Sequence, residues 1–163
     1  MSSDHVSRIL SEWTRERPEL DCSPIAVVGR LSRCTRDVEA RIEANYRRFG
    51  LHGGRYDLLA TLRRQGPPFR LNPTDLQGQM MISSGATTHR IDLLEREGLV
   101  ERFSDPDDRR GTLVALTEAG RSRVDEAIAS HLETEAEWLA ALGAPEREAL
   151  ARLLQTLAES HGI

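Results

Sequence analysis

Residues 71–117 constrain the fold more strongly than any other stretch, because they hold two helix signals followed by two strand signals. Pro73 suits a first helical position, and Asp75 falls where an acidic side chain favours the first turn, so a helix is predicted to begin there. A second helix is predicted to begin near Ser83 or Ser84, since either hydroxyl can cap it.

The second half of this stretch predicts a small β-hairpin. Gly98 can end the second helix, and two short candidate strands follow, Leu99–Phe103 and Thr112–Leu116. A turn rich in Asp, Pro and Gly, residues 104–111, separates them. The order helix, helix, strand, turn, strand predicts a winged helix-turn-helix.

The second helix has two unlike sides. Ile91 and Leu94 can seat it on a core, whereas its first turns carry short polar side chains. A helix that enters the major groove of DNA needs small donors and acceptors near its N-terminus, where its positive end also meets phosphate. The predicted DNA-contacting residues of this helix are Ser83, Ser84, Thr87, Thr88, His89 and Arg90. The alternative is a solvated polar helix end in an ordinary small α+β domain.

The tip of the predicted hairpin adds two arginines to this surface. Arg109 and Arg110 can reach a minor groove from a thin wing. Asp108 can hold the Arg110 guanidinium by a bidentate pair. The three residues are therefore predicted to belong to the DNA-binding surface.

The charge distribution limits how such a surface can work. The chain has net charge −4, and all 22 of its basic residues are arginines. Residues 1–70 carry net +4, residues 71–112 carry −3 and residues 113–163 carry −5. The predicted DNA-binding region is not basic, so binding must depend on a few placed arginines, doubled by symmetry.

Amphipathic helices are predicted on both sides of the winged unit. Asp4–Glu16 has an apolar stripe, and a long helix runs from Ser23 towards Gly50. The Gly53-Gly54 pair is predicted to interrupt the chain before a helix over Tyr56–Arg64. After Thr117, which can cap it, another long helix has the predicted buried residues Val124, Ile128, Leu132 and Leu139. The last helix has a stripe of Leu150, Leu153, Leu154 and Leu157.

These terminal stripes have no partner sheet in the chain, so they predict a dimer surface. The predicted fold is mainly α with a small β-wing, a winged helix-turn-helix flanked by N- and C-terminal dimerisation helices. The predicted division is 1–50 for N-terminal helices that dimerise and wall a ligand pocket, 51–117 for DNA binding, and 118–163 for further dimerisation helices.

One segment carries a family resemblance. Asp105 to Gly120 reads DPDDRRGTLVALTEAG and follows a helix that ends LLEREGLV. This D-x-R, strand, L-T-x-x-G arrangement resembles the wing signature of MarR-type transcription regulators. The resemblance implies a DNA-binding regulator and not an enzyme, paired through its terminal helices. Such a dimer would place two recognition helices one turn of DNA apart, ~34–36 Å, on a pseudo-palindromic operator.

Four residues that the apolar core does not explain suggest where a regulatory ligand binds. They are Trp13, Asp57, Arg64 and Arg90. Asp57 and Arg64 are seven residues apart on one predicted helix, hence on one face. Arg90 of the second helix can pair with Asp57, and an anion bound near Arg64 can compete for Arg90. The alternatives are a core role for Trp13, a solvated face for Asp57 and Arg64, and a phosphate contact for Arg90.

The N-terminal region sharpens this ligand prediction. A Trp-bearing first helix followed by RPELDCSP resembles the urate-responsive, PecS-like branch of the MarR family. That resemblance implies a urate signature of one Trp, an Asp and Arg seven apart, and an Arg of the recognition helix. In this chain the signature falls on Trp13, Asp57, Arg64 and Arg90. A urate-like anion is expected, with salicylate-like or aconitate-like anions as alternatives.

Other functions lack a supporting pattern. The histidines are scattered without metal-ligand spacing, and neither a nucleophile elbow nor a phosphate loop is present, so no catalysis and no cofactor are expected. No apolar run is long enough for a membrane span, and the N-terminus lacks a basic-then-apolar signal pattern, so a cytoplasmic protein is expected. Cys22 and Cys34 leave open a regulator switched by cysteine oxidation.

Overall fold

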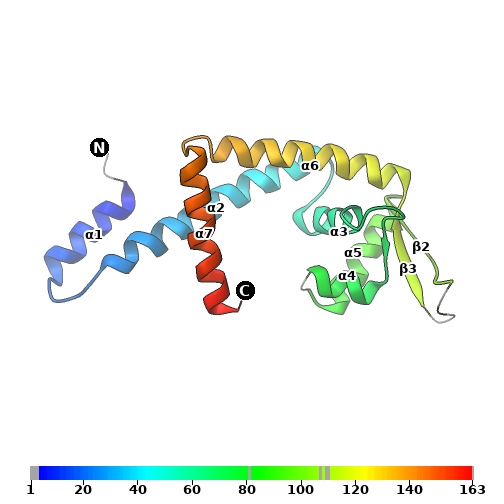
Figure 1. Ribbon diagram of the computed structural model, residues 1–163, viewed down its shortest axis with the longest axis horizontal. Helices are drawn as coiled ribbons and strands as arrows, with labels where there is room; N and C mark the ends of the chain where they lie inside the picture. The colour runs from blue at the N-terminus through cyan, green and yellow to red at the C-terminus, as the bar shows by residue number, and fades with distance from the viewer. Residues whose placement is uncertain (1–3, 81, 107, 109–110, 163) are drawn as a thin grey trace. The chain divides into compact units, whose positions relative to one another are not determined.

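The computed structural model describes residues 4–80, 82–106, 108 and 111–162, and it divides the chain into two compact units, Met1–Arg41 and Ile42–Ile163. The elements, in order, are α1 His5–Glu16, α2 Ser23–Arg48, α3 Gly53–Arg63, β1 Arg70–Leu71, α4 Pro73–Met80, α5 Ser84–Arg96, β2 Val100–Ser104, β3 Thr112–Leu116, α6 Glu118–Trp138 and α7 Ala144–His161 (Figure 1). The prediction of a mainly α fold with a small β-wing is confirmed. The three-part division of the chain stays a prediction.

The first unit contains α1 and the N-terminal part of α2. Asp4 caps α1, because its Oδ1 accepts a 2.7 Å hydrogen bond from the Ser7 amide. Arg30 of α2 donates to the same carboxylate at 2.8 Å. The Ser7 amide, followed by Arg30, lowers the pKa of Asp4 to about 2. Val6 is buried against Gly29, where an added Cβ would lie 3.3 Å from the Val6 Cγ1.

The second unit is built on a three-stranded antiparallel sheet in the order β1-β3-β2. The hairpin pairs Val100 with Leu116, so β2 begins one residue later than predicted. β1, which pairs Leu71 with Val114, was not predicted. The predicted break at Gly53-Gly54 is wrong, because both glycines lie in the first turn of α3.

The core of this unit joins the helix-turn-helix to the wing. Ile91 and Leu94 of α5 are buried, as predicted, and they belong to one apolar cluster. Other members are Leu51, Tyr56, Leu58, Leu59, Leu62, Leu76, Leu99, Val100, Val114, Leu116 and Val124. Burial of this set, which comes from α3, α4, α5, α6, the sheet and the adjoining loops, fixes the orientation of α5, the candidate recognition helix.

Helix ends in this unit follow capping rules. Ser83 caps α5 by accepting from the Ala86 amide at 3.3 Å, and Thr117 caps α6 by accepting from the Gly120 amide at 3.0 Å. Gly98 takes φ 71° after α5, and the Leu99 amide donates back to the Leu94 carbonyl at 2.9 Å. The chain can therefore turn directly from the recognition helix into the wing.

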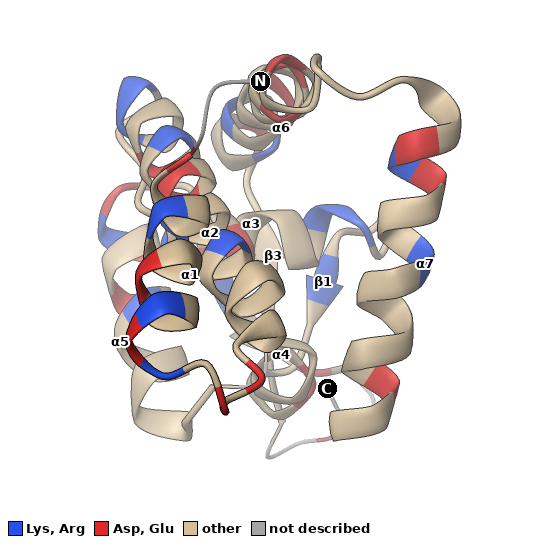
Figure 2. Ribbon diagram, turned by 90° about the vertical axis from the view of Figure 1, so that its left-hand side faces the viewer, with Lys and Arg blue, Asp and Glu red and all other residues tan. Residues whose placement is uncertain are grey.

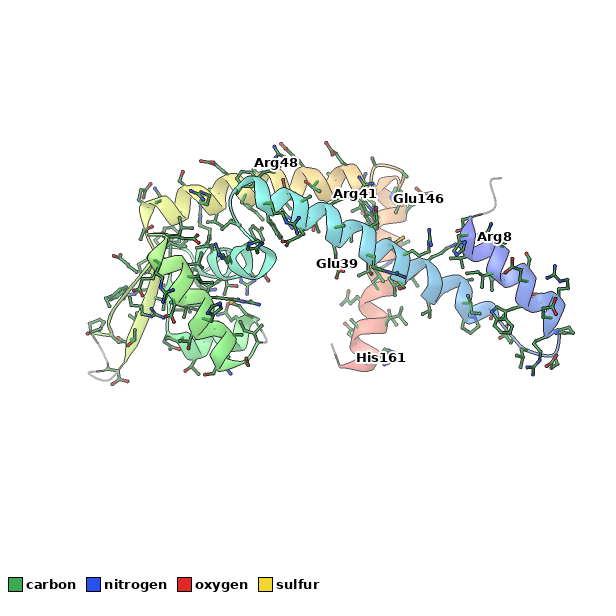
Figure 3. All side chains as sticks on the ribbon, turned by 180° about the vertical axis from the view of Figure 1, so that it is seen from behind. Arg8, Glu39, Arg41, Arg48, Glu146 and His161 are labelled. Carbon is green, nitrogen blue, oxygen red and sulfur yellow. The ribbon has the colours of Figure 1, made fainter. Side chains whose placement is uncertain are left out.

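The C-terminal helices expose apolar side chains. Val124 of α6 is buried, but Leu132 is 56% exposed, so its predicted place on the buried side is wrong. Arg48, the last residue of α2, donates a 3.4 Å hydrogen bond to the Ser130 hydroxyl of α6 (Figure 3). α7 has no buried residue, and its four stripe leucines are between 38% and 65% exposed.

Within the described ranges, no helix is both long and apolar enough to cross a membrane.

Candidate functional site

The polar end of α5 is exposed at four of the six predicted positions, with Arg90 partly buried and Thr87 buried. Ser83, Ser84, Thr88 and His89 are exposed. Thr87 is only 1% exposed, and its Oγ1 donates to the Ser83 carbonyl oxygen at 3.1 Å. The prediction that the Thr87 side chain contacts DNA is therefore wrong. The reason is helical spacing, because residues 87, 91 and 94 share one face, and Ile91 and Leu94 turn that face into the core.

α5 is clamped to the wing by charge. Figure 2 marks the charged residues of the chain, and α5 carries two arginines and two acidic residues, so this helix is not basic overall. Arg102 of β2 donates to Asp92 at 2.5 Å, and its guanidinium also contacts the Glu95 carboxylate. The Arg102 backbone amide donates to the same carboxylate at 3.2 Å. One strand residue thus pairs with two acidic groups of α5, which fixes the wing to the helix.

The turn at the tip of the wing is closed by backbone hydrogen bonds. The Gly111 amide donates to the Asp108 carbonyl oxygen at 2.8 Å, and the Asp105 amide donates to Gly111 at 3.0 Å. Asp108 is exposed at this tip. Arg109 and Arg110 lie outside the described residues, so their DNA contacts and the pair between Asp108 and Arg110 stay predictions.

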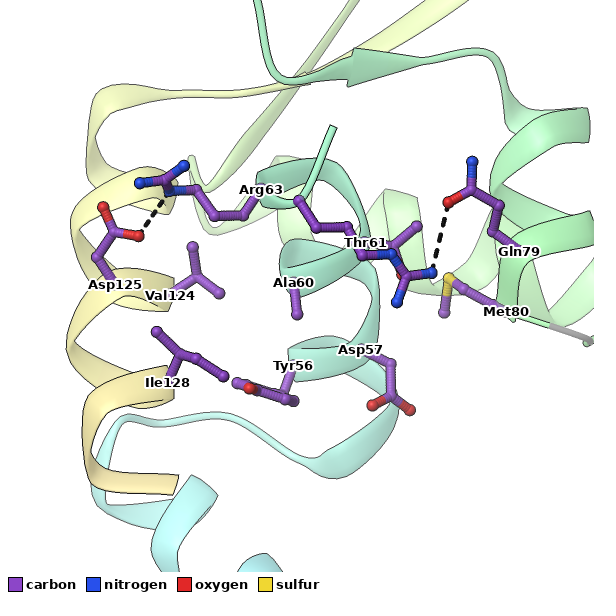
Figure 4. A pocket seen from close by; sticks show the side chains of 11 residues that line it. Tyr56, Asp57, Ala60, Thr61, Arg63, Gln79, Met80, Val124, Asp125 and Ile128 are labelled. Carbon is purple, nitrogen blue, oxygen red and sulfur yellow. Dashed lines mark hydrogen bonds and ion pairs between the residues drawn. The ribbon is translucent and has the colours of Figure 1, made fainter. Parts of the chain in front are cut away.

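A cleft of about 610 Å³ lies against α3. Asp57 and Arg64 both line it, which the seven-residue spacing predicted. Figure 4 shows α3 between two walls, with α6 on one side and the end of α4 on the other. The remaining lining residues are Tyr56, Ala60, Thr61, Arg63, Gln79, Met80, Val124, Asp125 and Ile128.

The two arginines of the cleft differ in their partners. Arg63 forms a 2.6 Å ion pair with Asp125 and stacks over Phe69 at 4.9 Å. Arg64 forms no ion pair with any carboxylate in the ranges that the structure covers. Its Nη2 donates to the neutral Gln79 Oε1 at 3.4 Å, a long hydrogen bond. Arg64 is therefore the cation of this cleft that an added anion can engage.

Asp57 is subject to opposing electrostatic effects. Surrounding protein atoms raise the pKa of its carboxyl, although the side chain is exposed to the cleft. Electrostatic interactions with Arg90, Arg64 and His131, in that order, act to lower the pKa of Asp57. Asp57 is thus electrostatically linked both to the cleft and to α5.

Arg90 lies beside the N-terminal end of α3. A Cβ added at Gly54 would lie 2.5 Å from the Arg90 Cζ, so the guanidinium occupies the space that Gly54 leaves open. Arg90 is not among the residues lining the cleft. Trp13 belongs to the first unit, where it is 44% exposed, so it is not an anchor of a core. The four-residue ligand site stays a prediction.

Sequence reasoning missed an aromatic stack next to Asp57. The rings of Tyr46 and Tyr56 lie 4.2 Å apart, and the His131 ring stacks on Tyr46 at 5.5 Å. His131 also contacts Glu135 at 3.1 Å. Burial, followed by the Asp57 charge, raises the pKa of Tyr56 to about 12. These rings come from α2, α3 and α6, so no local spacing could have linked them.

Both cysteines are free and lie in the first unit, with Cys34 exposed and Cys22 partly buried. A switch by cysteine oxidation stays a prediction.

Known proteins share this architecture. The MarR family model matches residues 53–112, and a curated relative aligns over 91% of the chain at 33% identity. The chain belongs to the MarR family: it is a DNA-binding transcription regulator and not an enzyme. That relative is the HTH-type transcriptional regulator PecS of Dickeya dadantii, and the 149 aligned residues cover 90% of its length.

Solved structures agree with the fold. The MarR family regulator Sco3205 of Streptomyces coelicolor, determined in complex with DNA, superposes with a TM-score of 0.76 at 23% identity, covering 86% of this chain and 92% of that one. BpsR of Bordetella bronchiseptica, described as regulated in DNA binding by 6-hydroxynicotinic acid, gives a TM-score of 0.68 at 26% identity, covering 82% and 98%. Both likenesses support a winged helix-turn-helix.

Proposed function

We propose that this regulator is a repressor that binds a pseudo-palindromic operator as a homodimer and is released by a small anionic ligand such as urate. The DNA-contacting residues in this proposal are Ser83, Ser84, Thr88, His89, Arg90, Asp108, Arg109 and Arg110. The ligand-binding residues are Trp13, Asp57, Arg64 and Arg90.

The observation that carries the ligand proposal is the link from Asp57 to two arginines of different elements. Asp57 lines the cleft with Arg64, and it interacts electrostatically with Arg90 of α5. An anion bound at Arg64 adds negative charge beside Asp57 and attracts Arg90. Because Arg90 is part of α5, such a shift acts directly on the helix proposed to read DNA.

The exposed leucines of α7 support the dimer. Four leucines spaced three, one and three residues apart form a continuous apolar stripe on a helix with no buried residue. Leu132 of α6 adds a further exposed apolar side chain. A twofold dimer that covers these groups removes an apolar surface from water and sets two α5 helices at a fixed spacing.

The relatives support the same class of function. PecS, at 33% identity, is a transcriptional regulator, and the DNA binding of BpsR is regulated by 6-hydroxynicotinic acid, a small aromatic carboxylic acid. An aromatic anion as effector is consistent with a cleft lined both by the Arg64 guanidinium and by apolar side chains such as Val124 and Ile128.

A gel shift with the intergenic DNA upstream of the protein's own gene tests this function. We expect one retarded complex, whose protein component is a dimer by light scattering, and we expect added urate to dissociate it. A complex that persists unchanged across the urate titration would refute the ligand, and a monomer in solution would refute the dimer.

A further inference from the structure

At the cleft, the side-chain amide of one α4 residue hydrogen-bonds to the two residues that follow α3. Gln79 and Met80 are the two residues of α4 that line the cleft. The Gln79 Oε1 accepts from Arg64 Nη2 at 3.4 Å and from Gln65 Nε2 at 3.0 Å. Figure 4 shows Gln79 and Met80 across α3 from Val124, Asp125 and Ile128. The opposite wall is fastened by a charged pair, Arg63 with Asp125, at 2.6 Å.

The Gln79 contact is the weaker of these two fastenings. The Gln79 oxygen lies 3.4 Å from the Arg64 guanidinium and has no net charge, whereas the Asp125 carboxylate lies 2.6 Å from Arg63 and carries a full negative charge, so the Gln79 contact holds its arginine less strongly. An anion that binds Arg64 therefore competes with the Gln79 oxygen for the Arg64 N–H donors. The same anion repels that oxygen and favours the amide NH₂ group of Gln79, which can donate to it.

Reorienting Gln79 also breaks its hydrogen bond to Gln65, so both side-chain hydrogen bonds from Gln79 to the residues after α3 change together. α4 packs on α5, and Leu76 of α4 shares the core cluster with Ile91 and Leu94. A change at Gln79 can therefore reach α5 through the packing of α4, by a route separate from Arg90.

We propose that Gln79 is a further specificity-determining residue of the cleft, which selects an anion by exchanging its contact with Arg64 and transmits occupancy to α4. This inference rests on the proposed function, in which the ligand is an anion bound at Arg64. It predicts that the charge and hydrogen-bonding capacity of residue 79 control ligand affinity and operator release separately.

Three variants test this role, with urate as the probe and calorimetry as the binding assay. Q79E gives Arg64 a carboxylate partner of the same shape and repels the ligand, so we expect urate affinity to fall about tenfold or more. Q77E puts the same charge on α4 away from the cleft lining, and we expect a change within about twofold. Operator binding without urate shows that each variant is folded.

The third variant, Q79M, removes the amide without adding charge. We expect saturating urate to weaken operator binding by a smaller factor in Q79M than in the wild type, because no amide then links Arg64 to α4. If the wild type binds urate and both Q79E and Q79M behave like it, the role of Gln79 is refuted while the ligand proposal stands. If the wild type does not bind urate, both fail.

Discussion

The guanidinium group of Arg90 fills the space above Gly54, where a Cβ atom would lie 2.5 Å from the Arg90 Cζ and 2.7 Å from its Nε. The Arg90 side chain of α5 can therefore take this position only because residue 54, at the start of α3, has no side chain. This contact places Arg90 near Asp57, three residues further along α3. Gly54 therefore has a positioning role that its place in a helix does not suggest.

G54A should displace Arg90 while the fold is retained, since the obstructed atoms are the far end of a flexible side chain. Alanine also favours a helix over glycine, by about 0.5–1 kcal/mol. We expect operator affinity without ligand to fall by about fivefold, roughly 1 kcal/mol, measured by fluorescence anisotropy.

G53A is the matched control, because a Cβ at Gly53 makes only ordinary contacts, 3.5 Å from Glu43 Oε2 and 3.9 Å from Tyr46. Equal operator affinities for G53A and G54A would show that the Arg90 position is unimportant for DNA binding.

Gly120 should tolerate no side chain. Its Cβ would lie 1.9 Å from the Leu99 carbonyl oxygen and 2.8 Å from the Leu99 carbonyl carbon, where α6 crosses the start of the wing. We expect G120A to lower the free energy of unfolding by about 3 kcal/mol, measured by urea denaturation.

Gly78 is the matched helical control, since nothing lies within 4 Å of its added Cβ. G78A should raise stability by about 0.5–1 kcal/mol through helix propensity. A G120A protein as stable as G78A would contradict the close approach of α6 to Leu99.

Arg102 should matter for DNA binding without touching DNA. R102M leaves Asp92 and Glu95 without their common cation, so the wing is no longer fixed to α5 by charge. Because these groups are partly exposed, we expect a loss of only about 1 kcal/mol in stability, together with weaker operator binding. R121M, which breaks an exposed pair with Glu118, should change neither quantity. Operator affinities that match between R102M and R121M would argue against a positioning role.

Ionisation of Asp57 should lower the stability of the fold, whereas ionisation of a carboxylate in an ion pair raises it. The raised pKa of Asp57 means that the native state binds the proton more tightly than the unfolded state, so ionisation opposes folding. This cost is present above the folded pKa and disappears as pH falls below the unfolded value. D57N should therefore be more stable than the wild type at pH 7, with the difference shrinking on acidification. Urea midpoints of both proteins between pH 7 and 4 measure this, and a constant difference would contradict it.

Local signals in the sequence were enough to predict the winged unit. Ser83 and Thr117 cap the helices proposed for them, and the strands begin within one residue of the prediction, because caps and turns depend on nearby residues. The spacing of Asp57 and Arg64 likewise placed them on one face of a helix.

Features that depend on remote partners could not be predicted in this way. β1 exists only because Arg70 pairs with Ala115, 45 positions away in the chain. The Gly53-Gly54 pair suggested a break, yet the Gly53 amide donates to Glu43 at 3.1 Å and Gly54 accommodates Arg90, so tertiary contacts extend the helix. Gln79 had no local signal as a cleft residue. Thr87 was different, since its spacing from Ile91 already indicated a buried position.

Release of operator by urate in the wild type and in R64A tests the central claim most directly. Arg64 is exposed and forms no ion pair in the described part of the chain, so R64A should fold and bind operator normally. With labelled operator and increasing urate, we predict that the wild type dissociates and that R64A stays bound. Release of both proteins at the same urate concentration would contradict an anion site at Arg64.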